Sequence, residues 1–187
     1  MGKYRTGLYL KLAKKRTTFG WIFFILVVIL GKGNVKHILT GLPFIILGEL
    51  IRSLSAGTIR KNEILATDGT YKLCRHPLYF GSFLISTGFV IASNNFFIFL
   101  YFIILFPLFY ISAIKKEENY LIEKFAQEYL NYRKTVPAFF PALRKINLKN
   151  ISFSQMIKNN EHINWLIITL VLLLLLIKAN KIFPIQT

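Results

Sequence analysis

The stretch FFIFLYFIILFPLFYISAI, from Phe96 to Ile114, contains no charged residue and decides the class of fold. About 20 mostly apolar residues cross the roughly 30 Å hydrocarbon layer of a bilayer as one helix, so this stretch predicts a membrane span. Further apolar stretches predict spans on either side of it: Thr17–Gly31, Val35–Leu54, Pro77–Ala92 and Ile163–Ile177. The first and the third spans of the chain are short, so tilt or flanking residues have to complete them. The predicted fold is all-α, an integral membrane bundle of about five transmembrane helices with a cytoplasmic catalytic segment.

Basic residues are distributed unevenly over the segments between these spans. Lysine and arginine number 24, against 8 acidic residues. Of these 24, 20 lie on alternate segments, and only Lys32, Lys36, Lys178 and Lys181 lie on the other side. Basic loops stay in the cytoplasm, so the pattern predicts a multi-pass protein of a cytoplasmic or inner membrane with its N-terminus in the cytoplasm. The positive charge therefore indicates topology and attraction to anionic membrane lipids, and not nucleic-acid binding.

Composition divides the chain into three parts. Residues 1–54 hold the basic N-terminal segment and the first two spans, residues 55–141 hold the third and fourth spans with a cytoplasmic helix, and residues 142–187 hold a polar connector and the C-terminal span. The cytoplasmic helix is predicted over Lys115–Lys134, because apolar residues recur there at three- and four-residue steps. The single cysteine, Cys74, excludes an intramolecular disulfide, and no residues have the spacing of metal ligands.

The densest polar cluster beside a predicted span is Arg75-His76-Pro77-Leu78-Tyr79. Proline suits the first turn of a helix, so the third span should begin at Pro77, with His76 near the N-cap and Tyr79 in the first turn. A helix N-terminus attracts anionic groups through its unpaired N–H groups and its partial positive charge, and Arg75 would strengthen that attraction. In the alternative, Arg75 and His76 only cap the helix or extend to the membrane interface.

Glu117 and Glu118 form a second polar cluster just after the fourth span. Adjacent negative charges at a helix C-terminus are unfavourable, so the pair indicates a docked cation unless it is a solvated helix face. Together the two clusters fit a zwitterionic ligand at the membrane surface, such as S-adenosylmethionine. Near the end of the second span, Glu49 and Arg52 either have a functional role or pair with each other at i,i+3.

The two clusters belong to a longer ordered pattern. Between Arg52 and Ser93 the sequence contains Ala-Gly-Thr-Ile-Arg-Lys, then Leu-Ala-Thr-Asp-Gly-Thr-Tyr, then Arg-His-Pro-Leu-Tyr-Phe-Gly. The pattern continues with Glu117-Glu118, Leu121, Phe125, Glu128-Tyr129, Tyr132, Val136-Pro137 and Phe140-Pro141. This combination covers about half of the chain and resembles the isoprenylcysteine carboxyl methyltransferase and phospholipid methyltransferase superfamily. The resemblance implies an intramembrane methyltransferase that uses S-adenosylmethionine. No Gly-x-Gly loop follows a strand, so the sequence does not support a Rossmann cofactor site.

The resemblance also implies which residues bind the cofactor. His76 and Tyr79 would contact it, and Glu117 and Glu118 would bind its polar end. Arg75, beside His76, is a candidate catalytic residue.

Other positions of the family pattern show departures. Gly69 and Tyr71 occupy the family's Gly-Pro-Tyr turn and are candidate cofactor residues, but Thr70 replaces the usual proline. Ala126 stands where a glycine often follows the phenylalanine. Arg133 is a second candidate catalytic residue that would position the acceptor, unless it only binds lipid phosphate. The neighbouring Tyr132 is typical of aromatic residues at a membrane interface.

The function that the sequence favours is methyl transfer from S-adenosylmethionine to a lipophilic or lipidated acceptor that enters from the bilayer. The acceptor would be an isoprenylcysteine carboxylate, a phospholipid amine or another amphiphile. Two alternatives stay open. Membrane sterol and enone reductases, which use NADPH, resemble the family over the same Arg-His-Pro stretch, although the glutamate pair and the residues after it favour the methyltransferase. A non-enzymatic membrane interaction protein would keep the fold without a cofactor.

Overall fold

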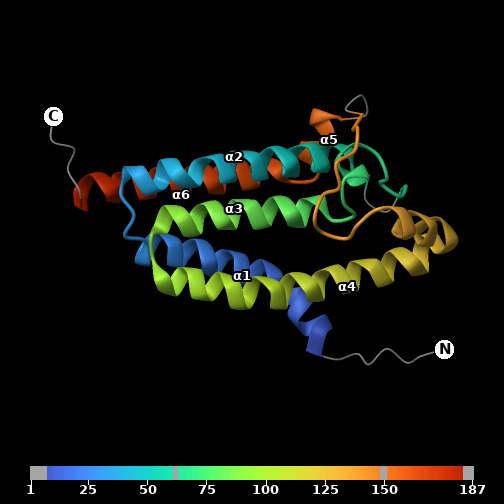
Figure 1. The fold of residues 1–187 in the computed structure, drawn as a ribbon, viewed down its shortest axis with the longest axis horizontal. Coiled ribbons are helices and arrows are strands. Elements are labelled where there is room, and N and C mark those ends of the chain that lie inside the picture. The colour runs from blue at the N-terminus through green and yellow to red at the C-terminus, as the bar shows by residue number, and fades with distance from the viewer. Residues whose placement is uncertain (1–7, 61–62, 148–150, 183–187) are drawn as a thin grey trace.

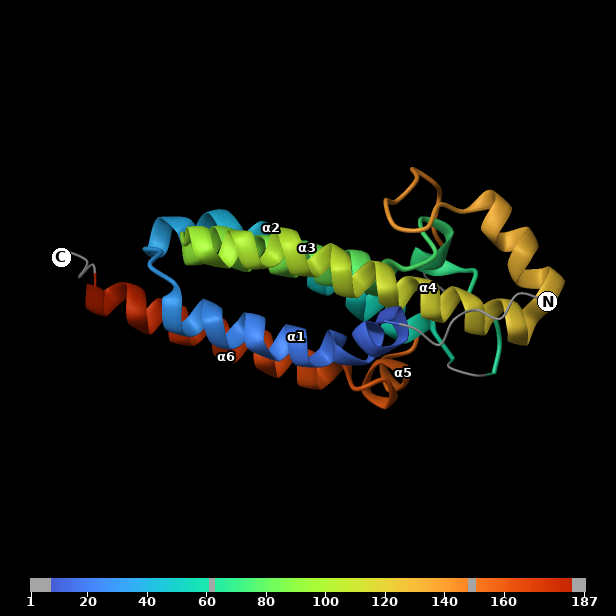
Figure 2. The ribbon, with the colours of Figure 1, turned by 90° about the horizontal axis from the view of Figure 1, so that it is seen from below.

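A computed structural model describes residues 8–60, 63–147 and 151–182. In this part of the chain there are six α-helices, one short 3-10 helix and no strand, so the predicted all-α class is confirmed. In chain order the elements are α1 (Leu8–Leu30), α2 (Val35–Thr58), η1 (Gly69–Lys72), α3 (Pro77–Ser93), α4 (Phe96–Thr135), α5 (Phe153–Lys158) and α6 (Glu161–Ile182). The long helices run along one common axis, while η1, α5 and the last part of α4 gather at one end (Figures 1 and 2). The basic residues Lys3, Arg5, Lys61 and Lys149 lie outside the described residues.

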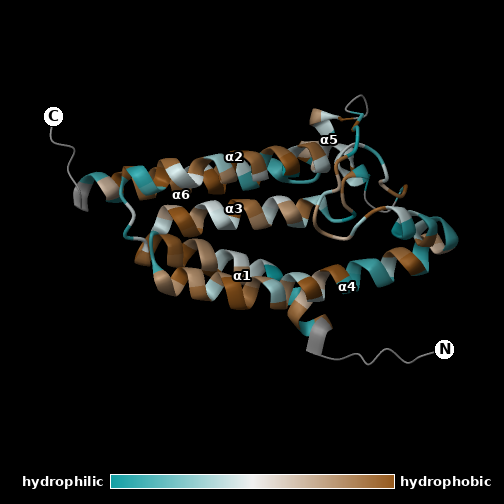
Figure 3. Ribbon diagram, in the orientation of Figure 1, coloured by the Kyte–Doolittle hydropathy of each residue, from teal (hydrophilic) through white to brown (hydrophobic). Residues whose placement is uncertain are grey.

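All five predicted spans lie in helices. Three helices, α2, α4 and α6, are long and apolar enough to cross a bilayer. The apolar helix α3 begins at Pro77, as predicted, but has only 17 residues. The helix α1 carries Lys14, Lys15 and Arg16 before its apolar half. Apolar residues follow the long helices and polar residues gather at the end with η1 and α5 (Figure 3). The chain is therefore a helical membrane protein, and whether α1 and α3 also cross the bilayer stays a prediction.

Helix α4 is longer than a membrane span because the predicted amphipathic helix continues from it without a loop. Its 40 residues at about 1.5 Å each exceed the hydrocarbon thickness about twofold. The apolar part, Phe96–Ile114, fits the bilayer, and the remainder projects beyond it. The helix ends at Thr135 with Val136 as its C-cap, as the following proline predicted. Ala126 interrupts the helix with φ 41° and ψ −116°, and the last part of α4 runs in a different direction (Figure 2).

Helices α2 and α3 pack with their backbones in direct contact. A Cβ atom added to Gly41 would overlap the carbonyl oxygen of Gly88, and one added to Gly48 would come within 2.6 Å of the carbonyl oxygen of Gly81. No larger side chain fits at either crossing, so these two glycine pairs, here called the glycine seam, allow the close approach. The seam fixes the start of α3 relative to the end of α2, and both of these helix ends contribute to the site described below.

The two short turns of the bundle meet at the end away from α5. The backbone N–H of Lys32 donates to the carbonyl of Ser93 at 2.7 Å, and the Asn95 side chain donates to the carbonyl of Leu30 at 2.8 Å. Lys178 near the end of α6 reaches the same region through a 2.7 Å hydrogen bond from Nζ to the carbonyl of Ile29. The sparsely basic segments therefore share one end of the bundle, and the strongly basic segments gather at the other.

The polar connector closes over the end of α2. Nδ2 of Asn159 donates to the carbonyls of Ala56 and Ile59 at 2.8 and 3.0 Å, and Nε2 of Gln155 donates to that of Ile59 at 3.0 Å. The last carbonyls of a helix have no partner within it, so these side chains cap α2. The connector thereby brings the start of α6 beside α2.

Arg52 pairs with Glu161 at the start of α6. Its Nε and Nη2 atoms donate to the two carboxylate oxygens at 2.8 and 3.0 Å. The alternative in which Arg52 pairs with Glu49 is wrong, because α6 supplies an acidic partner that is 109 residues away in the chain. Glu49 instead accepts hydrogen bonds from Ser53 at 3.3 Å and from Asn164 at 2.7 Å. These contacts fasten the C-terminal helix to α2.

Candidate functional site

A glycine turn positions the loop between α2 and α3. Gly69 has φ 58°, in the left-handed region that favours glycine, and begins η1. The hydroxyl oxygens of Thr70 and Ser55, both buried, lie 2.8 Å apart. A proline at position 70 could not form this hydrogen bond, so the departure from the family pattern is compensated by a buried polar contact. Tyr71 is buried, and its carbonyl accepts a 2.6 Å hydrogen bond from the hydroxyl of Tyr132.

His76 is the N-cap of α3, and proline follows it at the first helical position. The backbone N–H groups of Arg75 and His76 donate to the carbonyls of Pro137 and Ala138 at 2.9 and 3.1 Å. The segment after α4 therefore holds this helix start in place. The imidazole of His76 is almost fully buried and stacks on the ring of Tyr79, with centroids 5.6 Å apart and an interplanar angle of 9°.

Glu118 contacts three basic side chains, those of Arg75, His76 and Arg133. Its Oε1 accepts a hydrogen bond from Nε of Arg75 at 3.0 Å and lies 3.4 Å from Nε2 of His76. Nη2 of Arg133 lies 3.9 Å from its other oxygen. Burial by itself would raise the pKa of the Glu118 carboxyl, but the hydrogen bonds from His76 and Arg75 and the charge of Arg75 outweigh burial and lower the pKa to about 2. Glu118 is therefore an ionised partner of Arg75 at neutral pH.

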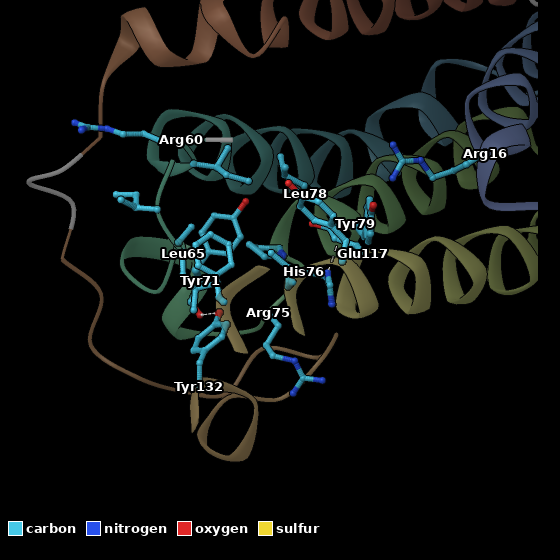
Figure 4. A pocket seen from close by; sticks show the side chains of 17 residues that line it. Arg16, Arg60, Leu65, Tyr71, Arg75, His76, Leu78, Tyr79, Glu117 and Tyr132 are labelled. Carbon is cyan, nitrogen blue, oxygen red and sulfur yellow. Dashed lines mark hydrogen bonds and ion pairs between the residues drawn. The ribbon is translucent and has the colours of Figure 1, made fainter. Parts of the chain in front are cut away.

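A cavity of about 340 Å³, the first cavity, lies between the loop before α3 and the polar part of α4 that follows Ile114. Tyr71, His76, Tyr79 and Glu117 line it, and Figure 4 shows them grouped around one space. Oε2 of Glu117 is 3.9 Å from Nδ1 of His76, and the Glu117 side chain keeps 38% of its surface exposed. The predicted convergence of the Arg-His-Pro-x-Tyr helix start with the glutamate pair is thus present in the structure.

The remaining predicted site residues lie at the edge of this cavity or behind it. Gly69, Glu118 and Arg133 are not among the residues that line it. Arg75 lines the cavity, but its guanidinium is directed to Glu118 and away from Glu117 (Figure 4). The side chain of Arg133 is 47% exposed, on the far side of Glu118. The catalytic roles of the two arginines stay predictions, and their contacts fit residues that position others.

Sequence reasoning missed several residues that line the first cavity, among them Arg60, Arg16 and Tyr132. Arg60 and Arg16 lie at opposite ends of the first cavity (Figure 4). Tyr132 lines it as well, although its sequence position is typical of an interface aromatic, and burial raises the pKa of its hydroxyl. Aromatic residues recur after the glutamate pair, and this pattern could have indicated that Tyr132 faces the cavity. No local pattern distinguishes Arg16 from the exposed lysines beside it.

A second cavity, of about 360 Å³, lies among α1, α2, α3 and α6. Arg16, Leu78 and Tyr79 line both cavities, so the two meet at the start of α3. Apolar side chains of α1 form much of the second cavity, and Arg52 and Glu161 lie at its polar end. The apolar α1 residues are Phe19, Trp21, Phe23 and Phe24. An amphiphilic molecule fits this combination of walls.

Comparison with known proteins shows which family this chain resembles. Residues 51–128 match the family model described as phospholipid methyltransferase. Through this segment the chain is similar to the isoprenylcysteine and phospholipid methyltransferase superfamily. The matched segment contains η1, α3 and most of α4, whereas α1 and α6, which help to enclose the second cavity, lie outside it.

Several named proteins resemble this chain at moderate identity. The protein-S-isoprenylcysteine O-methyltransferase of Schizosaccharomyces pombe is 33% identical over 116 residues, which are 56% of this chain and 49% of that protein. Protein-S-isoprenylcysteine O-methyltransferase B of Arabidopsis thaliana is 34% identical over 113 residues, 54% of this chain and 57% of that protein. The cobalt-zinc-cadmium resistance protein CzcN of Cupriavidus metallidurans is 37% identical over 84 residues, 45% of this chain and 38% of that protein. The chain thus spans about half the length of these curated relatives. No solved structure matches it.

Proposed function

We propose that this protein is a membrane-embedded methyltransferase that uses S-adenosylmethionine to methylate a lipophilic acceptor. The observation that carries the proposal is the convergence of His76, Tyr79 and Glu117 on one cavity beside the apolar helices. Several of its relatives are named as isoprenylcysteine O-methyltransferases, and these names support the same reaction class.

The lining of the first cavity fits the charges of S-adenosylmethionine. Its volume of about 340 Å³ lies within the range of about 300–1,000 Å³ that is usual for small-molecule sites. Glu117 offers a carboxylate to a cationic group. Arg60 is an exposed residue at the edge of the cavity, and its guanidinium points outward (Figure 4). The rings of Tyr71 and Tyr79 offer π faces, which attract a cation such as a sulfonium.

Bound S-adenosylmethionine supplies an activated methyl group, and its transfer is an in-line displacement for which orientation and exclusion of water provide most of the acceleration. In this proposal Glu117, His76 and Tyr79 orient the cofactor. The ion pair of Arg75 and Glu118 keeps the start of α3 against α4, so that His76 and Glu117 hold their spacing. Gly69 shapes the turn that presents Tyr71.

The second cavity is the proposed acceptor site. It shares Leu78 and Tyr79 with the first cavity, so an acceptor in it would meet the cofactor beside these residues. Its apolar walls suit a lipid chain that enters from the bilayer. We place this end of the bundle and the N-terminus in the cytoplasm, because 20 of the 24 basic residues belong to the segments on that side.

Equilibrium binding of methyl-labelled S-adenosylmethionine to the purified full-length protein tests the proposal. We expect saturable binding in wild type and a loss of affinity of about tenfold or more in Glu117→Gln, because a charged hydrogen-bond acceptor is removed. Glu123→Gln is the matched control, since Glu123 is an exposed residue of the same helix. Binding of NADPH in place of S-adenosylmethionine would support the reductase alternative. Binding of neither would overturn an enzymatic role.

A further inference from the structure

We propose that residues 136–147, here called the return loop, enter the leaflet on their side of the bilayer and bind anionic phospholipid head groups. In this arrangement Phe140 and Leu143 contact acyl chains, and Arg144 and Lys145 contact lipid phosphates. The return loop lines neither cavity and lies outside the segment that matches the phospholipid methyltransferase model. The inference therefore goes beyond the proposed function and does not depend on a cofactor.

The return loop runs from the end of α4 back to the start of α3 (Figure 1). The carbonyls of Pro137 and Ala138 accept the hydrogen bonds from the start of α3 described above, and the backbone N–H of Ala142 donates to the carbonyl of Leu73 at 2.9 Å. Pro141 has no N–H to satisfy. Non-helical backbone is tolerated near the hydrocarbon only where its polar groups find partners. These pairings allow the return loop to approach the hydrocarbon.

Aromatic contacts place the return loop at the depth of the apolar helices. The ring centroid of Phe139 lies 5.8 Å from that of Phe83 in α3, and the centroid of Phe83 lies 5.5 Å from that of Phe106 in α4. Phe106 precedes Ile114, the end of the uncharged part of α4, by about 12 Å of helix. The return loop thus reaches back past the end of that part, to the level of the hydrocarbon.

The return loop exposes large apolar side chains at this level. Phe140 is 71% exposed although its ring centroid lies 6.5 Å from that of Phe80, and Leu143 is fully exposed. Acyl chains surround the apolar helices at this depth, and they would cover both side chains. The position of the return loop therefore favours the bilayer as the partner of this surface.

The charge of the surrounding sequence specifies the kind of lipid. Between Glu128 and Glu161 the sequence contains six basic residues and no acidic one. Two of the six, Arg144 and Lys145, directly follow Leu143 and are exposed. Basic side chains at the membrane surface attract anionic phospholipids, and their long stems can lie along acyl chains while the charge stays at the head groups. An apolar tip followed by two basic residues is complementary to an anionic leaflet.

Quenching of tryptophan fluorescence by lipids brominated on their acyl chains tests the depth of the return loop. The full-length protein is reconstituted in vesicles, and the signal of its two native tryptophans is subtracted with wild type. We expect Leu143→Trp to be quenched at least twice as strongly as Glu123→Trp, because Glu123 is exposed on the polar part of α4. Leu143 is fully exposed, so its replacement removes no packing. Phe140→Trp is a second position that should give the same result.

A bromine label on one lipid class at a time tests the head-group preference. Vesicles of phosphatidylcholine contain the same mole fraction of brominated phosphatidylglycerol or of brominated phosphatidylcholine. We expect phosphatidylglycerol to quench Leu143→Trp about twofold more strongly or better. Adding Arg144→Gln and Lys145→Gln should abolish the preference. Adding Lys32→Gln and Lys36→Gln removes the same charge from exposed residues at the opposite end of the bundle and should leave the preference unchanged.

Two results would overturn the inference. If Leu143→Trp and Phe140→Trp are quenched no more than Glu123→Trp, the return loop faces water and another partner, such as a second copy of this chain, covers it. If the two brominated lipids quench equally, the return loop binds no anionic head group. Neither measurement involves S-adenosylmethionine, so a failure here is distinct from a failure of the proposed function.

Discussion

Arg75 and Glu118, which are 43 residues apart in the chain, form an ion pair in which the two side chains are only 9% and 12% exposed. Nη1 of Arg75 also donates to the carbonyl of Val136 at 2.7 Å. One guanidinium thus joins the start of α3, the polar part of α4 and the segment that follows α4. The start of α3 and the polar part of α4 line the first cavity, so its shape depends on this contact.

Replacing Glu118 should destabilise the protein. Glu118→Gln leaves the Arg75 guanidinium without its charged partner in a nearly buried site, which costs about 2–4 kcal/mol of unfolding free energy. Thermal unfolding of the purified protein in detergent measures the loss. In a double-mutant cycle with Arg75→Met, the two single losses should not add, because both remove the same contact. Fully additive losses would show that the pair is not coupled.

The contribution of Glu118 to stability should disappear in acid. Its folded pKa is about 2, below its ordinary value of 4.5, so the contribution is complete above about pH 4.5 and is lost as the pH falls towards 2. Unfolding temperatures of wild type and Glu118→Gln, measured from pH 7 to pH 3, should therefore approach each other below about pH 4.5. A difference that stays constant over this range would contradict the assignment of the low pKa.

Cys74 should react slowly with thiol reagents while the protein is folded. It is 1% exposed, and burial raises the pKa of its thiol to about 12, so almost no thiolate is present at pH 8. Labelling with a maleimide dye should become fast only when the protein unfolds, which also provides an unfolding assay with a single reporter. Rapid labelling of the folded protein would mean that the loop before α3 opens readily.

Ala126→Gly should raise stability. A residue with a Cβ atom at φ 41° and ψ −116° is strained, and glycine removes about 1 kcal/mol or more of that cost. The same change at Ala113, a buried position in the regular part of α4, should lower stability by about 1 kcal/mol. Unfolding midpoints of the two variants should therefore move in opposite directions. A lower midpoint for Ala126→Gly would show that the break in α4 carries no strain.

Glu161→Gln should loosen the C-terminal helix. Glu161 is 3% exposed and neutralises Arg52, so its loss leaves a guanidinium without its carboxylate partner at the end of the second cavity. We expect proteolysis in the connector before α6 to be faster than in wild type, and gel electrophoresis of timed samples measures the rate. Glu63→Gln is the control, because Glu63 and Lys158 form an exposed pair at 3.9 Å that contributes little. If Glu161→Gln and Glu63→Gln are cleaved at the same rate, the Arg52–Glu161 pair does not hold α6 against α2.

Local sequence patterns predicted where the helices lie. The contacts between residues far apart in the chain could not be predicted in this way. The uncharged stretch from Phe96 and the proline at position 77 predicted a span and a helix start, because hydrophobic length and backbone chemistry act within one segment. The partner of Arg52 could not be predicted, since it depends on how α6 packs. Arg75 and Glu118 were assigned separately to opposite charges of a ligand, and their contact appears only when α3 and α4 are side by side.

The glycine seam limits how the bundle can open. The backbones of α2 and α3 are in direct contact where the helices cross, so the two helices cannot separate or slide without losing this contact. They therefore form the rigid part of the bundle. The outer helices α1 and α6 face the second cavity through their side chains, which can repack. In the proposed function, exchange of product for a new lipid would require movement of α1 or α6 relative to α2 and α3. The exchange would then depend on two helices that lie outside residues 51–128, the segment that matches the phospholipid methyltransferase model.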